Sequence, residues 1–141
     1  VIDTCVQRGL ATVGHIVTSG TSRGGYMALY ALARDERIAA AAGFAPVTDW
    51  RVLAEFEADV AQPRVAALAL SGYAGRLAGR SVFLGIGKED ARVSTQGCLD
   101  TADTLVAAGV EVELLLTDDL GHSLGPAGYE RGTLFLLDRV S

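Results

Sequence analysis

The sequence contains no asparagine, and among its 141 residues there are only two cysteines, three prolines and a single lysine. Without asparagine the chain has no N-glycosylation site. Cys5 and Cys98 lie far apart in the chain and match no metal-binding or disulfide framework. We therefore expect no metal site and two small buried thiols.

Positive charge is also scarce. The chain has 12 Lys and Arg residues against 17 Asp and Glu residues, which gives a net charge of −5. No basic cluster offsets this balance, so we expect no nucleic-acid or anionic-membrane partner. The longest uncharged apolar run, residues 38–47, is far shorter than the ~20 residues of a membrane span.

What the chain does have is apolar content, since 50% of its residues are hydrophobic, which excludes disorder. A chain of 141 residues predicts one domain that buries roughly 70% of its extended surface. The sequence begins without Met and without a signal-peptide pattern, so we expect that the start of the polypeptide is missing.

Short apolar runs alternate with helical patterns along the whole chain. The runs predict four strands, at residues 15–19, 38–44, 82–87 and 110–117. Helices are predicted over residues 1–10 and 24–35, in two stretches within 49–70, before Gly109, and over 127–140. This alternation predicts an α/β fold, a parallel sheet of about four strands with helices on both faces. A functional site is then expected beyond the carboxyl ends of the strands.

The first predicted strand is followed by Gly20-Thr21-Ser22-Arg23-Gly24-Gly25. This is the G-x-S-x-G nucleophile elbow, in which a sharp strand-to-helix turn lifts a serine hydroxyl above the sheet. We expect the glycines to be needed because neighbouring backbone passes too close for a Cβ, and we expect Tyr26 and Met27 in the core. Ser22 is the candidate nucleophile. The alternative is an ordinary serine in a glycine-rich turn that caps a helix.

A serine nucleophile needs a base, and the chain has only two histidines. His15 begins the strand that ends before Ser22, which places it roughly 20 Å away at the wrong end of the sheet. His122 lies directly after the fourth predicted strand, at the expected edge. His122 is therefore the candidate base.

The imidazole in turn needs an acid that holds its tautomer. Asp90 lies just after the third predicted strand and is the first candidate, and Glu89 beside it would point differently. Asp49, after the second strand, is the other candidate, although it is also placed to cap the next helix. Asp118 and Asp119 precede the histidine too closely to face its ring easily.

The chain order Ser22, Asp90, His122 is that of the triad of α/β-hydrolases. Three features resemble the prolyl-oligopeptidase-like and esterase branch of that superfamily. They are Gly25, which is the second glycine of a G-x-S-x-G-G elbow, the segment 87–93, which is similar to a G-x-x-D-x-x-V acid loop, and the Gly121-His122 pair. The resemblance covers essentially the whole chain, so residues 1–141 look like the C-terminal part of one α/β-hydrolase catalytic domain.

The resemblance implies a serine hydrolase without a cofactor, in which Ser22 attacks a carbonyl, His122 transfers the proton and water resolves the acyl-enzyme. The backbone N–H of Arg23 is then one oxyanion donor, and the loop that gives the other lies upstream in the family. The strand at 15–19 is central in the family, and here one of its edges has no partner. We therefore predict that these 141 residues alone are unstable or inactive.

Residues 49–80 lie where the family inserts cap helices. Trp50, Phe56, Leu70 and Tyr73 either line a substrate pocket there or belong to the core. The function that fits best is hydrolysis of a carboxylic ester or a peptide. The alternative is a catalytically silent α/β-hydrolase-like binding module. The glycines match neither the P-loop nor the dinucleotide fingerprint, and nothing in the sequence indicates localisation or oligomeric state.

Overall fold

The computed structural model describes residues 1–141, apart from the side chain of Leu120. Its centre is one parallel sheet in the order β1-β2-β3-β4. The strands are β1 (Ile16–Thr21), β2 (Ile38–Phe44), β3 (Ser81–Glu89) and β4 (Glu111–Leu120). The four predicted strands are confirmed, and all but β2 end two or three residues later than predicted.

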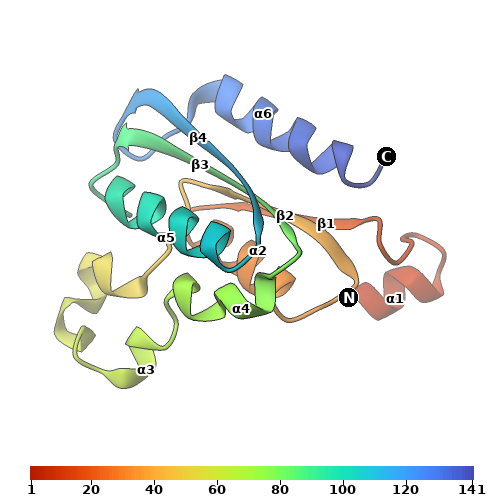
Figure 1. The fold of residues 1–141 in the computed structure, drawn as a ribbon, viewed down its shortest axis with the longest axis horizontal. Helices are drawn as coiled ribbons and strands as arrows, with labels where there is room; N and C mark the ends of the chain where they lie inside the picture. Colours follow the sequence, from red (N-terminus) through yellow and green to blue (C-terminus); the bar gives the residue numbers. More distant parts are fainter.

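Helices cover both faces of the sheet, as the sequence predicts (Figure 1). On one face lies α6 (Gly125–Asp138), and on the other lie α2 (Arg23–Leu32), α4 (Ala74–Leu77) and α5 (Thr95–Ala107), while α1 (Ile2–Gln7) lies beside the sheet. The two central strands, β2 and β3, are therefore largely buried on both faces, which is why β2 can lack polar residues altogether. Among the helices described here, none is long and apolar enough to cross a membrane.

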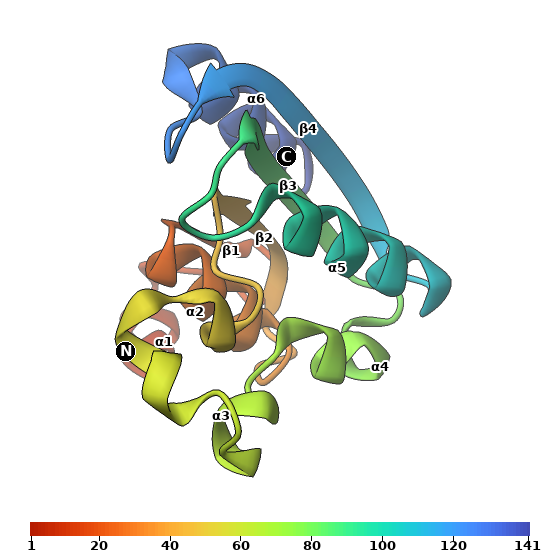
Figure 2. The same cartoon turned by 90° about the vertical axis from the view of Figure 1, so that its left-hand side faces the viewer.

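The segment from residue 49 to 80 consists of short helical pieces, at the end of the molecule away from α6 (Figure 2). They are η1 (Trp50–Val52), η2 (Ala54–Asp59), α3 (Pro63–Ala66) and η3 (Leu70–Tyr73), followed by α4. The predicted helix through Trp50, Leu53 and Phe56 is thus wrong in detail. Leu53 has extended backbone angles, φ −82° and ψ 130°, and interrupts the helical path while its side chain is buried.

Two burial predictions are wrong. Of the two cysteines expected to be buried, only Cys98 is, while Cys5 on α1 is half-buried. Tyr26 is buried as expected, but Met27 is 54% exposed. Helix α2 packs on β1 and β2 through the face that carries Tyr26 and Leu29. The next residue along a helix points about 100° away, and in this sheet β1 is an edge strand, so Met27 lies beyond the covered area.

Candidate active site

Ser22 occupies the sharp turn between β1 and α2 and is half-buried. Its backbone angles are φ 57° and ψ −118°, in a region that residues with a side chain rarely adopt. Such a conformation costs of order 1–3 kcal/mol and persists only where surrounding contacts impose it. The strained strand-to-helix turn is the local geometry that the G-x-S-x-G motif predicts.

The elbow glycines differ in how much the turn needs them. A Cβ on Gly20 would lie 2.3 Å from the Gly24 carbonyl, and one on Gly25 would lie 2.9 Å from the Pro46 ring. Both positions therefore require glycine, as expected. At Gly24 nothing lies within 4 Å of an added Cβ, so the expectation of a steric need is wrong there.

The backbone N–H of Arg23 is the first amide of α2. The first N–H groups of a helix have no acceptor within the helix, so this amide is available to a ligand oxygen. The Arg23 side chain turns away to an ion pair with Glu55 on η2, and both side chains are about half exposed. The residue after Ser22 thus links the turn to the 49–80 segment.

Asp90 lies immediately after β3 and is 2% exposed. Its Oδ1 accepts the backbone N–H groups of Arg92 and Val93, at 3.0 and 3.1 Å. These two bonds hold the carboxylate and leave Oδ2 for another partner. Its own backbone N–H donates to the Thr95 hydroxyl (2.9 Å), which in turn donates to the Gly87 carbonyl (2.6 Å).

The partner of Oδ2 is His122, whose Nδ1 lies 2.7 Å away. A carboxylate only accepts hydrogen bonds, so the proton of the neutral ring sits on Nδ1. Nε2 is then left with a free lone pair, as a general base requires. The imidazole is 20% exposed and the carboxylate is fully buried, so the pair is open on the histidine side only.

The chain after β4 turns back along the sheet and so carries His122 toward the level of Ser22. Gly87 lies under this loop, where an added Cβ would be 2.7 Å from the Asp119 carbonyl. The Leu124 side chain then packs against Gly85. In the strand register Gly85 pairs with Phe44, and Phe44 pairs with Thr21, the residue before Ser22. Among the contacts that the structure describes, none joins the Ser22 hydroxyl to the imidazole; such bonds often form only with substrate.

The other candidates have different surroundings. Asp49 caps η1 and binds Arg51; burial raises its pKa, but the Arg51 hydrogen bonds outweigh that and lower it overall. Glu89 is exposed, and Asp118 pairs with Lys88 in solvent. His15 is exposed at the amino end of β1, away from Ser22.

Two neutral acids are buried near these loops. Burial, aided by the negative charge of Asp90, raises the pKa of the Cys98 thiol to about 12, so it stays protonated. Burial also raises the pKa of Tyr26 to about 12.

Tyr26 packs edge-on against Trp50, with 5.0 Å between ring centres, and Leu70 is fully buried. These contacts show that part of the 49–80 segment belongs to the core.

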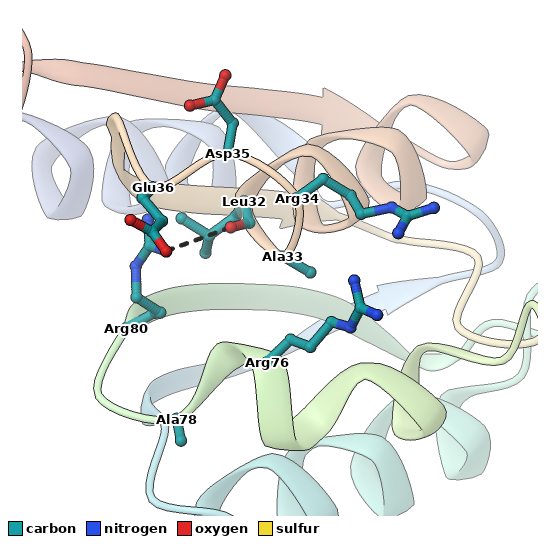
Figure 3. Close-up of a pocket in the computed structure, with 8 residues that line it drawn as sticks. All are labelled: Leu32, Ala33, Arg34, Asp35, Glu36, Arg76, Ala78 and Arg80. Atoms are coloured by element: carbon teal, nitrogen blue, oxygen red, sulfur yellow. Dashed lines mark hydrogen bonds between the residues drawn. The ribbon is translucent and has the colours of Figure 1, made fainter.

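A cleft of about 710 Å³ lies at the amino ends of β2 and β3, between the end of α2 and α4 (Figure 3). Its arginines are partly engaged by the protein itself. The Arg80 guanidinium donates to the carbonyls of Leu32 and Ile38, and that of Arg34 donates to the Tyr30 hydroxyl. Ser22 and His122 lie elsewhere, so this cleft is separate from the candidate site. Among the described residues, no three His, Cys, Asp or Glu side chains gather to hold a metal ion.

Thr95 is the residue of this site that the sequence does not reveal. Its hydroxyl bridges the Gly87 carbonyl and the Asp90 amide, and thereby closes the loop that presents the carboxylate. Both partners are backbone groups, which leave no trace in a residue pattern. The only local signal is a hydroxyl residue five positions after the acid, at the start of a helix.

The parallel sheet, covered by helices on both faces and carrying a strained serine turn, has the architecture of an α/β-hydrolase. The sequence signature of the prolyl oligopeptidase family matches residues 1–136. The chain belongs to this family of serine hydrolases. No curated protein matches the chain in sequence.

Solved structures agree with this fold. The acylaminoacyl peptidase of Pyrococcus horikoshii has a TM-score of 0.78 at 19% identity, over 97% of this chain and 25% of that one. Dipeptidyl peptidase 4 of Porphyromonas gingivalis has 0.77 at 26% identity, over 91% of this chain and 20% of that one. An acetyl xylan esterase from Paenibacillus sp. R4 has 0.78 at 20% identity, over 97% and 49%. This chain thus spans between a fifth and a half of their lengths.

Proposed function

We propose that this chain carries the catalytic triad Ser22, Asp90 and His122 of a hydrolase that cleaves a carboxylic ester or a peptide bond. The observation that carries the proposal is the 2.7 Å hydrogen bond between His122 Nδ1 and the buried carboxylate of Asp90. The two residues follow the neighbouring strands β3 and β4, and Ser22 follows β1 at the same, carboxyl end of this parallel sheet. A metal or cofactor is not part of the proposal.

In this mechanism Ser22 Oγ attacks the substrate carbonyl carbon while His122 Nε2 takes the hydroxyl proton. Asp90 holds the imidazole and stabilises its positive charge. The negative oxygen of the tetrahedral intermediate is stabilised by the Arg23 N–H. His122 then returns the proton to the leaving alcohol or amine. Water, activated by the same imidazole, releases the acid and restores the serine.

The remaining parts of the site are proposals of the same kind. The second oxyanion donor is expected from a loop upstream of this segment, since one missing donor costs ~10²–10³ in turnover. The 49–80 segment is proposed as the wall of the substrate site, because Arg23 and Glu55 link it to the elbow. Because the second oxyanion donor is expected outside them, the isolated 141 residues remain predicted to be inactive or unstable.

The test is covalent labelling of the full-length protein with a fluorophosphonate probe, read by intact mass. One adduct is expected on the parent and none on Ser22→Ala or His122→Ala. Ser141→Ala is the matched control, because Ser141 is an exposed serine beyond the end of α6 and outside the residues proposed for the site. That variant should label like the parent.

Labelling that persists in Ser22→Ala would assign the nucleophile elsewhere. A folded parent that takes up no probe would overturn the hydrolase proposal and favour the silent binding module. A positive result leads to a comparison of acetyl esters with peptide anilides. The relatives named above act on both kinds of substrate, by their names, so the two are to be tested in parallel.

A further inference from the structure

The turn that follows β2, residues 44–47, contains the second strained residue near the elbow. Ala45 has φ 43°, in the left-handed region that favours glycine, and it is 1% exposed. A strained residue persists where its surroundings impose it, and such residues cluster at functional sites. The strain therefore raises the question of what this turn holds in place.

The first thing it holds is the backbone of Ser22. The Ser22 N–H donates to the Phe44 carbonyl (2.9 Å), and the Ser22 carbonyl accepts from the Val47 N–H (3.0 Å). Both main-chain polar groups of the candidate nucleophile are thus bound by residues on either side of Ala45. The turn can reach both only by folding back on itself.

The second thing it holds is β3. The Ala45 N–H donates to the Gly85 carbonyl at 2.7 Å, on the strand that ends just before Asp90. Gly85 is also where Leu124 packs, since a Cβ there would lie 2.3 Å from the Leu124 side chain. Leu124 is two residues beyond His122. Ala45 therefore binds β3, the strand that leads to Asp90 and against which the segment carrying His122 packs.

Pro46 fixes the turn from its other side. A Cβ added to Gly25 would lie 2.9 Å from the Pro46 ring, and one added to Gly43 would lie 3.0 Å from it. Proline also restricts its own φ to about −65°. The space between α2 and β2 is therefore filled by this ring, and the turn has little room to shift.

We propose that Ala45 is a positioning residue of the site: its left-handed conformation lets the 44–47 turn bind the Ser22 backbone and β3 together, and so sets Ser22 relative to the Asp90–His122 pair. The inference rests on the proposed function. Ala45 itself touches no reacting atom. Its effect is on geometry, and a displacement of about 1 Å can lower a rate ~10²-fold.

The test compares two identical substitutions in β2 and the turn after it, made in the full-length protein. Ala45→Gly keeps the left-handed conformation accessible but lets the turn sample others, because glycine adopts both signs of φ. Ala40→Gly is the matched control. Ala40 is fully buried in β2, toward the end of that strand that lies away from Ser22. The measurements are kcat, KM, fluorophosphonate labelling rate and melting temperature.

We expect Ala45→Gly to lower kcat and the labelling rate by about 10-fold while KM stays within about 2-fold. Ala40→Gly should leave kcat of the folded protein unchanged, whatever its melting temperature. A purely structural role for Ala45 would make the two variants alike, with parental kcat below their melting transitions. That result would overturn the proposal.

A second variant covers the case in which Ala45→Gly does not fold. Pro46→Ala loosens the same turn and leaves Ala45 in place, so it should lower the labelling rate in the same direction. Parental labelling in Pro46→Ala would overturn the proposal too. Failure of the proposed function is recognised separately, because then either the folded parent would take up no probe or Ser22→Ala would still react with it.

Discussion

Two aspartates follow neighbouring strands of the sheet, Asp49 after β2 and Asp90 after β3, and their local sequences are alike. Each has an arginine two residues further on, in Asp49-Trp50-Arg51 and Asp90-Ala91-Arg92. In each, the side-chain Oδ1 accepts the backbone N–H of that arginine, at 2.9 and 3.0 Å. The two loops share this hydrogen bond.

They differ in what happens to the second oxygen. Both oxygens of Asp49 bind the Arg51 guanidinium, so the carboxylate is consumed within its own loop. In the other loop Oδ1 takes a second amide, that of Val93, the Arg92 side chain stays exposed, and Oδ2 binds His122. An acid is therefore useful to a histidine when its local hydrogen bonds leave one oxygen free and its burial excludes water.

The largest expected effect separates the two aspartates directly. In Asp90→Asn the amide cannot stabilise an imidazolium and favours the wrong tautomer of His122, so kcat should fall roughly 10³–10⁴-fold. Asp49→Asn should change kcat by less than about 3-fold, because Asp49 contacts Arg51 instead. Steady-state kinetics on one ester substrate measures both. Equal losses would mean that the two loops are not distinguished as the hydrogen bonds indicate.

A smaller effect is expected from the hydroxyl that closes only the Asp90 loop. Thr95→Val keeps the shape of the side chain but leaves the Gly87 carbonyl and the Asp90 N–H without their partner. Losing buried hydrogen bonds of this kind costs about 1–3 kcal/mol of stability. We expect kcat to fall about 10-fold as the carboxylate loses its fixed position. Thr95→Ser, which retains the hydroxyl, should recover most of the kcat. If Val and Ser variants share the same kcat, the hydroxyl does not position Asp90.

The parts of this structure that sequence predicts are those decided by neighbours in the chain. The strands follow from β-branched and apolar runs, and the elbow follows from glycines at Gly20 and Gly25 whose Cβ positions are occupied by backbone or ring atoms. The chain order and the sheet-edge rule select Ser22 and His122 as candidates.

The parts that escape prediction depend on tertiary surroundings. The D-x-R sequences around Asp49 and Asp90 are equivalent, and only burial and the position of His122 separate them. Met27 is as apolar as its neighbours on α2, but how far around the helix the sheet covers it is a property of the sheet. Thr95 and Ala45 bind backbone groups, which are those of Gly87 and Asp90 for Thr95 and that of Gly85 on β3 for Ala45. Residue types alone do not encode such contacts.

The smallest effect concerns the electrostatics of the Asp49 loop. Burial acts to raise the pKa of Asp49, but the Arg51 hydrogen bonds and charge outweigh it and lower the pKa overall. Arg51→Gln removes the guanidinium hydrogen bonds and the positive charge but keeps the backbone N–H of residue 51, so the pKa of Asp49 should rise from its lowered value. NMR titration of the Asp49 carboxyl carbon measures this directly.

The stability of the parent should follow the same sign. A carboxyl whose pKa is lower in the folded state contributes stability above its unfolded pKa, and this contribution disappears as the pH falls through the folded pKa. Thermal melts of Arg51→Gln should therefore lose the parent's Asp49-linked stability at neutral pH, by a small amount because the pair is partly exposed. The matched change Arg92→Gln, at the same spacing from Asp90, should alter neither the Asp49 titration nor kcat. A rise in the pKa of Asp49 in both arginine variants would show that the pKa is lowered by positive charge in general and not by the contact with Arg51.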